Sequence, residues 1–192
     1  MDEIAITGMG ILSSNAVDVV DFNEALIKGT SNFSVSSERE ENSIVGAFIK
    51  GFQLETHLEK YHSICPEVYK RAKRYLKNTE LAMQTTAIAC IEAWVNAGLY
   101  SDCFNKEQIG IVVAGSNLSQ VMNYRMALKS LSVNSTILPS YALHYFDTNF
   151  VGVLSDMLQI QGEGFSVGGA CASGNVAIIN ACRMLKEKRI NI

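Results

Sequence analysis

Apolar side chains recur at the helical period in four parts of the chain. The strongest stripe runs through 79–97, and Gly98 follows where a helix C-terminus is expected. Shorter helical periods cover 18–28, which Gly29 ends, and 149–158. A fourth helix is predicted over 175–188, with basic residues in its last turn. The stripe residues are Leu81, Thr85, Ile88, Ile91 and Val95 in the strongest helix and Ile178, Cys182 and Leu185 in the last.

Short apolar runs that end at glycines predict strands between these helices. The runs lie at 3–7, 109–114 and 165–167. Strands that alternate with helices favour an α/β architecture. Ile190 and Ile192 are interpreted as the start of a further strand.

Composition narrows the class of protein. With 192 residues, 48% of them apolar, the chain can bury the core of one globular domain, which excludes a disordered tail. The net charge of −3 gives no case for nucleic-acid binding, and no apolar run is long enough to span a membrane. The acidic start is unlike a secretory signal, and five cysteines without a CxxC pair indicate reduced thiols. We therefore expect a cytoplasmic protein.

Charge is spread unevenly along the chain. Six bases between Lys60 and Asn78 face a single acid, Glu67. By contrast, no Lys or Arg occurs from Ser130 to Cys182, so this segment is expected to lie inside the protein or against another subunit.

The sharpest chemical candidate is Cys171, between the last predicted strand and the last helix. Its neighbours from Gly168 to Gly174 are all Gly, Ala or Ser, so a strained turn can form and a substrate can approach the sulfur. A helix N-terminus favours a thiolate, and its unpaired N–H groups can stabilise an oxyanion. The residues alone leave two interpretations of Cys171 open, a nucleophile or a small apolar side chain. The second is favoured for Cys65, Cys90, Cys103 and Cys182.

The segment Gly169-Ala170-Cys171-Ala172-Ser173-Gly174, followed by an apolar helix, resembles the active-site segment of the β-ketoacyl-acyl-carrier-protein synthases, the condensing enzymes of fatty-acid and polyketide synthesis. The resemblance runs along the whole chain: Ile4 to Gly10 is similar to the family's opening strand and turn, Ala97-Gly98-Leu99 to a helix end, and Gly110 to Ser116 to the next core strand. Two positions depart from the family pattern, because Gly169 replaces a common threonine and Glu163 a usual proline.

The resemblance implies a thiolase-like α/β fold. Residues 1–192 would form a single domain, the N-terminal half of that fold, with a mixed sheet covered by helices as part of an αβαβα layered architecture. The last strand of this half and the whole C-terminal half would be absent. The expected partners are therefore a C-terminal ketosynthase half or a complementary subunit, in a homodimer or heterodimer with 165–169 at the subunit interface.

The resemblance also implies a reaction. Cys171 would accept an acyl group from an acyl carrier protein, and a malonyl-type unit would be decarboxylated and attack the resulting thioester. No resident cofactor or metal is expected, because the phosphopantetheine arrives on the carrier. Leu118 matches a position that lines the acyl pocket, although it is also a plausible core leucine. A basic cluster matches a region that can meet the acidic carrier, although it also suits a solvated helix face: Lys70, Arg71, Lys73, Arg74 and Lys77.

The family's two catalytic histidines and its second oxyanion loop come from the C-terminal half. His57, His62 and His144 all precede Cys171 and match neither histidine motif, so none is assigned a catalytic role. Residues 1–192 alone are therefore expected neither to condense nor to decarboxylate malonyl thioesters.

Three alternatives remain open: a non-catalytic ketosynthase-like partner subunit, an inactive truncated fragment and, more remotely, a cysteine hydrolase. Retention of Cys171 argues against the first. The turn around Cys171 resembles a hydrolase nucleophile elbow, but no histidine follows it. Gly8-Met9-Gly10 fails the dinucleotide-binding pattern at its third glycine, and no residues have metal-ligand spacing.

Overall fold

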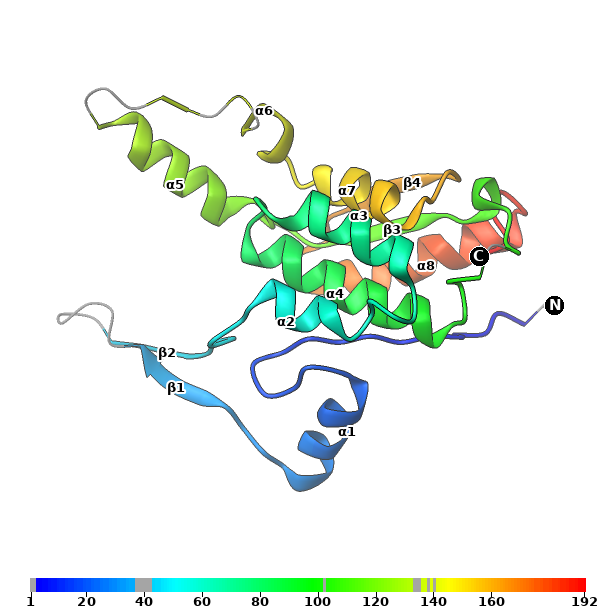
Figure 1. Ribbon diagram of the computed structural model, residues 1–192, viewed down its shortest axis with the longest axis horizontal. Helices are drawn as coiled ribbons and strands as arrows, with labels where there is room; N and C mark the ends of the chain where they lie inside the picture. Colours follow the sequence, from blue (N-terminus) through cyan, green and yellow to red (C-terminus); the bar gives the residue numbers. More distant parts are fainter. Residues whose placement is uncertain (1–2, 37–42, 102, 133–135, 138, 140) are drawn as a thin grey trace.

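The computed structural model describes residues 3–36, 43–101, 103–132, 136–137, 139 and 141–192. Figure 1 labels the elements on the ribbon. In chain order they are α1 (Val19–Lys28), β1 (Phe33–Ser36), β2 (Ile44–Ala47), α2 (Leu54–Glu59), α3 (Pro66–Leu76), α4 (Leu81–Asn96), η1 (Lys106–Gln108), β3 (Ile111–Ala114), α5 (Gln120–Ser130), α6 (Tyr141–His144), α7 (Asn149–Leu158), β4 (Gly164–Val167), η2 (Ala170–Ala172) and α8 (Ser173–Lys186).

A parallel pair of strands, β3 and β4, lies between two layers of helices. Ile111 pairs with Gly164, and the register continues to Ala114 and Val167. Ile111 and Val113 face the core shared with α4 and α7, so the alternating residues of β3 point to the opposite face. Helix α8 packs on β3, and in Figure 1 it lies behind the strands while α3 and α4 lie in front. This arrangement is the α/β architecture that the sequence predicts.

The main core lies on the α3–α4–α7 side of the strands. Helices α2, α3, α4 and α7 pack against one another there. Burial of these branched and unbranched apolar side chains is the chief stabilising contribution, about 1.5 to 3 kcal/mol for each large one. The largest fully buried side chains of these helices are Leu58, Leu76, Ile88, Ile91, Leu154 and Met157.

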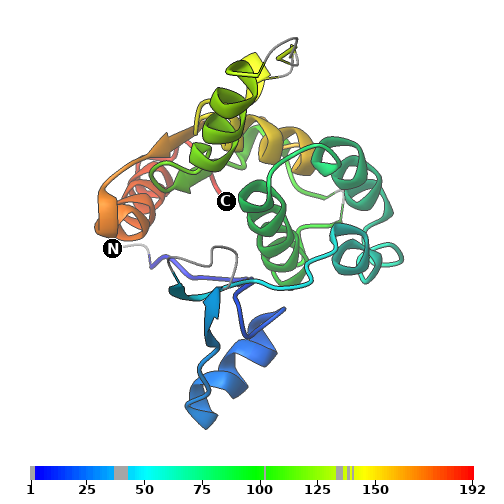
Figure 2. The same cartoon turned by 90° about the vertical axis from the view of Figure 1, so that its left-hand side faces the viewer.

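Helix α1 and the antiparallel hairpin of β1 and β2 extend away from this core, as Figures 1 and 2 show. The Asp18 carboxylate caps α1 by accepting from the N–H of Asp21 at 2.9 Å, and Gly29 ends the helix at φ +63°. Ala25 is the one residue of α1 that is buried. Leu26, Ile27, Phe33 and Val45 remain exposed, so this part of the chain presents an apolar surface.

The helix and strand predictions are largely confirmed. Helices α1, α4 and α7 lie where the apolar periods place them, and β3 and β4 fall within or beside the predicted strands. The predicted stripe of α8 is only partly buried, because Ile178 is 59% exposed while Cys182 and Leu185 are half-buried. The buried residues of α8 are Ser173, Ala177 and Met184. Among the described residues, no helix is both long and apolar enough to cross a bilayer.

The strand predicted at 3–7 is also wrong. Among the described residues this segment has no strand partner, and Ile6 is 79% exposed. The residues after it lie along α4, where the N–H of Met9 donates to Asn96 Oδ1 at 3.1 Å and the N–H of Ile11 to Glu92 Oε2 at 2.9 Å. The backbone that follows the predicted strand therefore bonds to side chains of α4.

At the other end of the chain, Ile192 bonds to the residues that lead into β3. Its N–H donates to the carbonyl of Gln108 at 3.1 Å, and its carbonyl accepts from Gly110 at 2.8 Å. This hydrogen-bond pattern is that of a parallel strand pair, although no strand is formed at 190–192.

Candidate active site at the carboxyl ends of β3 and β4

The loops that follow β3 and β4 meet beside Cys171. Because the strands are parallel, their carboxyl ends lie at the same edge, the usual place for ligands in open α/β sheets. Gly115 bonds to Val167 at 3.1 Å across this edge, and a Cβ on Gly168 would lie 3.4 Å from Ser116 Oγ. The fold thus brings Leu118 and Cys171, which are 53 positions apart in the sequence, onto neighbouring loops.

The turn that carries Cys171 is a single 3-10 turn, Ala170–Ala172, leading directly into α8. Ala170 has φ +46°, in the left-handed region that disfavours residues with a Cβ. The buried Ser173 hydroxyl holds the turn from inside: Oγ accepts from the N–H of Gly169 at 2.8 Å and donates to the carbonyl of Ala170 at 2.7 Å. A strained backbone fixed by a buried hydroxyl is the geometry expected of a positioned nucleophile.

The five thiols occupy different surroundings. Cys171 and Cys103 are exposed, and Cys182 is half-buried. Burial raises the pKa of Cys65, with Arg71 opposing the shift, and burial raises the pKa of Cys90 to about 11. Cys65 is buried and Cys90 half-buried, and with a raised pKa both thiols are expected to react more slowly than an exposed thiol. Cys103 contacts Ser101 Oγ at 2.9 Å in an irregular loop, whereas Cys171 alone combines exposure with a helix N-terminus.

Leu118 is half-buried and packs against the main core. It lines a small cavity between the N-terminal ends of α4, α5 and α7, with Met83, Met122 and Phe150 as its apolar walls. The cavity volume is about 20 Å³, which is room for about one water molecule. The two methionines are flexible side chains that can give way to a larger apolar group.

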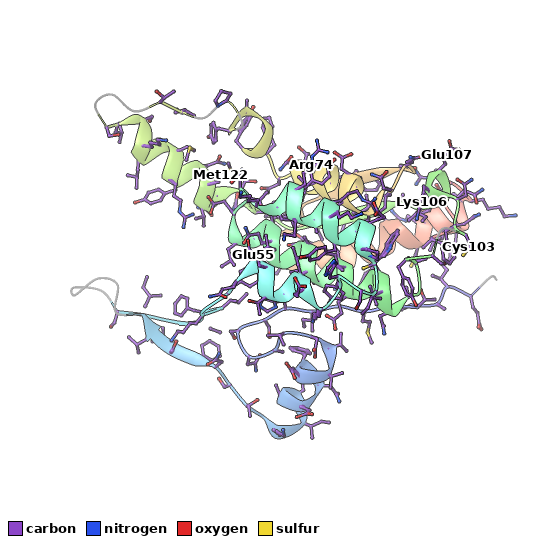
Figure 3. The ribbon with its side chains drawn as sticks, viewed as in Figure 1. Glu55, Arg74, Cys103, Lys106, Glu107 and Met122 are labelled. Atoms are coloured by element: carbon purple, nitrogen blue, oxygen red, sulfur yellow. The ribbon has the colours of Figure 1, made fainter. Side chains whose placement is uncertain are left out.

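The basic cluster lies on α3. Lys70, Lys73, Arg74 and Lys77 are exposed, and Figure 3 shows Arg74 on the outer side of this helix. Lys70 pairs with Glu67 at 2.7 Å. Arg71 differs from the other four, because it is half-buried and its Nε donates to the carbonyl of Met157 at 2.8 Å. That bond joins α3 to α7.

The described histidine side chains stack on aromatic rings. His57 stacks on Phe52 at 4.8 Å between ring centroids, and burial and Lys60 lower its pKa. His62 stacks on Tyr69 at 4.5 Å and lies 3.3 Å from Glu59 Oε1. The side chain of His144 lies outside the described residues, although its backbone belongs to α6.

Two residues that position the site were not singled out from the sequence. Ser173 holds the turn, and its place at a helix N-terminus, where Ser is favoured, was the available signal. Asp147 accepts from the N–H of Ser119 at 2.9 Å and so fixes the loop after β3 to the start of α7. The signal for Asp147 was that it is one of the few charged residues in a segment that has no Lys or Arg.

Several known proteins are similar to this chain. It is 28% identical over its full length to the polyketide biosynthesis malonyl-ACP decarboxylase PksF of Bacillus subtilis (strain 168), of which it covers 43%. It is 22% identical to the 3-oxoacyl-[acyl-carrier-protein] synthase 1 of Buchnera aphidicola subsp. Baizongia pistaciae, with 97% of this chain and 44% of the relative covered. The chain thus spans less than half the length of these curated relatives.

Solved structures share its fold. A beta-ketoacyl synthase from Burkholderia phymatum STM815 superposes with a TM-score of 0.72 at 19% identity, over 99% of this chain and 45% of that one. The ishigamide ketosynthase/chain length factor gives 0.70 at 15% identity, over 96% and 49%. The fold is therefore the thiolase-like ketosynthase fold that the sequence predicts. The family model "Beta-ketoacyl synthase, N-terminal domain" matches residues 1–192, so this chain belongs to the beta-ketoacyl synthase family.

Proposed function

We propose that this chain is the acyl-accepting half of a β-ketoacyl-acyl-carrier-protein synthase, with Cys171 as the nucleophile. The observation that carries the proposal is the turn itself: an exposed thiol at the N-terminus of α8, held by the buried Ser173 hydroxyl beside the loop that carries Leu118. The Cys171 thiolate attacks the carbonyl carbon of an acyl thioester on the carrier. A new carbon–sulfur bond forms to Cys171, and the carrier's phosphopantetheine thiolate leaves and takes up a proton.

The loops around Cys171 supply part of what the transfer requires. The backbone N–H of Cys171 is the proposed oxyanion donor from this chain. Leu118, with Met83 and Met122, would receive the first carbons of the acyl group, and the small cavity there favours a short acyl group unless the methionines move.

An acidic carrier would dock on α3. The exposed face of α3 carries several positive charges, from Lys70, Lys73, Arg74 and Lys77. These charges attract an acidic partner even though the chain is negative overall. The bond from Arg71 to Met157 holds that helix against the core. Arg71 would therefore contribute to docking chiefly by fixing the position of α3.

Decarboxylation and condensation would require residues from a further polypeptide segment. The two described histidine side chains stack on Phe52 and Tyr69 rather than beside Cys171. The exposed apolar side chains of α1, the β1–β2 hairpin and α8 support a partner that covers them, as a C-terminal ketosynthase half, a complementary subunit or a second copy in a dimer would. In α8 these side chains are Ile178 and Ile179.

Acyl transfer to Cys171 tests the proposal directly. Incubation with an acetyl-loaded acyl carrier protein should leave one acetyl group on the peptide that contains Cys171, as detected by mass spectrometry. Cys171→Ala should abolish the adduct, whereas Cys103→Ala, which removes the other exposed thiol, should retain it. An adduct on Cys103 or Cys65 in place of Cys171 would contradict the proposal.

A non-catalytic ketosynthase-like partner subunit is the second candidate. One solved structure with this fold is named a ketosynthase/chain length factor, and its name joins a ketosynthase to a second protein, a chain length factor. If Cys171 stays unmodified by the loaded carrier, both with and without a complementary ketosynthase half, this second candidate is the correct one.

A further inference from the structure

A second cavity opens at the amino ends of β3 and β4, the opposite end from the Cys171 turn. Its volume of about 430 Å³ lies in the range of small-molecule sites, roughly 300 to 1,000 Å³. Its walls come from the start of α3, the end of α4, and the segments that precede β3 and β4. The lining residues that matter here are Cys65, Arg71, Trp94, Tyr100, Lys106 and Gln161.

Two cations face this cavity without a carboxylate partner among the described residues. The Nε bond to Met157 fixes the Arg71 guanidinium at the wall, and its two terminal nitrogens bond to no described residue. Lys106 Nζ lies 5.2 Å from the ring centroid of Trp94. Glu67 is the one acid among the lining residues. It pairs with Lys70, which does not line the cavity, and the Arg71 charge also acts on it. The lining residues therefore carry two positive charges and one negative charge, a net charge of +1.

The rest of the lining is apolar or neutral. Trp94 is only 6% exposed, and Val68, Leu99 and Leu158 extend its apolar wall. Tyr100 and Gln161 add neutral hydrogen-bonding groups at the rim. Figure 3 shows Lys106 close to Glu107 and Cys103, at the far end of the molecule from Met122 and the Leu118 cavity.

We propose that this cavity binds a small organic anion in which a carboxylate or phosphate group is attached to an aromatic ring. Arg71 offers a planar pair of N–H donors that suits either oxyanion, and Lys106 adds a point charge. Trp94 and the aliphatic side chains provide the dry wall against which the ring lies. No described carboxylate lies within ion-pair distance of Arg71 or Lys106, which distinguishes this cavity from an ordinary surface depression, where Lys and Arg pair with nearby acids.

Trp94 is the only tryptophan of the chain, so its fluorescence reports on this cavity alone. Titration with phenyl phosphate, with excitation selective for tryptophan, should change its emission in a saturable manner. Sodium benzoate should compete, which tests the carboxylate form of the ligand. Lys106→Met should weaken binding about fivefold, the size expected for loss of one partly exposed charge interaction, and Lys106→Arg should restore it.

Matched controls separate specific binding from general effects. Lys50→Met removes an exposed charge far from this cavity and should leave the affinity unchanged. Phenol and inorganic phosphate carry only the ring or only the anion, and each should bind more weakly than phenyl phosphate. A linear response to phenyl phosphate, an equal affinity for phenol, or an unchanged affinity in Lys106→Met would each overturn the proposal.

Discussion

Small residues have different roles in the Cys171 turn and in the body of the molecule. We define the body as α3, α4 and α7 with residues 107–113 and 160–164. In the body, a Cβ on Gly162 would lie 2.4 Å from the carbonyl oxygen of Ile109, so there is no room for a side chain. In the turn, Cys171 is exposed, and Ala170 sits in a left-handed conformation that a glycine would adopt more easily.

The difference shows where stability and reactivity reside. The body buries Leu76, Ile88 and Ile91 completely and carries most of the apolar burial. The turn contributes little burial, and a few hydrogen bonds around Ser173 set its shape. Substitutions in the body should therefore change unfolding, whereas substitutions in the turn should change the chemistry of Cys171 more than the stability.

The largest expected effect is the loss of close packing at Gly162. Gly162→Ala would press a methyl group against two backbone carbonyls, those of Ile109 at 2.4 Å and Glu107 at 2.7 Å. Backbone cannot move aside as a flexible side chain can, so the free energy of unfolding should fall by about 3 kcal/mol or more. Urea denaturation followed by circular dichroism measures this change.

Gly152→Ala is the matched control. Gly152 lies inside α7, and a Cβ there would meet no described atom within 4 Å. The substitution should raise the free energy of unfolding by about 0.5 to 1 kcal/mol through helix propensity alone. Equal effects at the two glycines would show that the body is not packed as described.

The sequence pattern predicted the body better than its surroundings. The periods of α4 and α7 and the apolar run of β3 are strong because these elements bury one or both faces in a core that the chain itself completes. The fold class and the place of Cys171 at a strand-to-helix turn followed from the same signals.

The predictions failed where local pattern and tertiary contacts disagree. Ile4 and Ile6 suit a strand, but Ile6 is 79% exposed, and the residues that follow lie beside α4, where Gly8 and Gly10 approach the helix backbone too closely for any side chain. Apolar residues occur on more than one face of α8. The helical period alone therefore could not show that Met184 is buried and Ile178 exposed. The hydroxyl bonds of Ser173 depend on the strained φ of Ala170, which no sequence signal encodes.

A second prediction compares the thiols of the two regions through pH. Burial raises the pKa of Cys90 in α4 to about 11, above the 9.0 expected for a free thiol. Between pH 9 and 11 the folded state thus keeps a proton that the unfolded state loses, so stability falls as pH rises through this window. The loss should approach about 2 kcal/mol, and urea midpoints measured from pH 8 to 11 would show it.

Cys90→Ala should flatten this slope, whereas Cys103→Ala, which removes an exposed thiol, should leave it unchanged. A residual slope should remain above pH 10, because burial also raises the pKa of Tyr61. The body thiol is expected to be alkylated slowly at pH 8. Alkylation of Cys90 as fast as that of Cys171 would contradict the contrast between the two regions.

The smallest expected effect on stability is at Ser173, which should matter more for reactivity. Ser173→Ala leaves the N–H of Gly169 without its buried acceptor, whereas the carbonyl of Ala170 keeps its bond from the N–H of residue 173, so the cost is about 1 kcal/mol. The turn would then relax from the left-handed conformation at Ala170, and Cys171 would lose its fixed orientation. We expect iodoacetamide labelling of Cys171 to change rate, with labelling of Cys103 as the internal reference.

Ser130→Ala, which removes an exposed hydroxyl bond to Ala127, should change neither rate. If Ser173→Ala and Ser130→Ala gave the same Cys171 labelling rate, the turn would hold its shape without the hydroxyl of Ser173, which would contradict the positioning role.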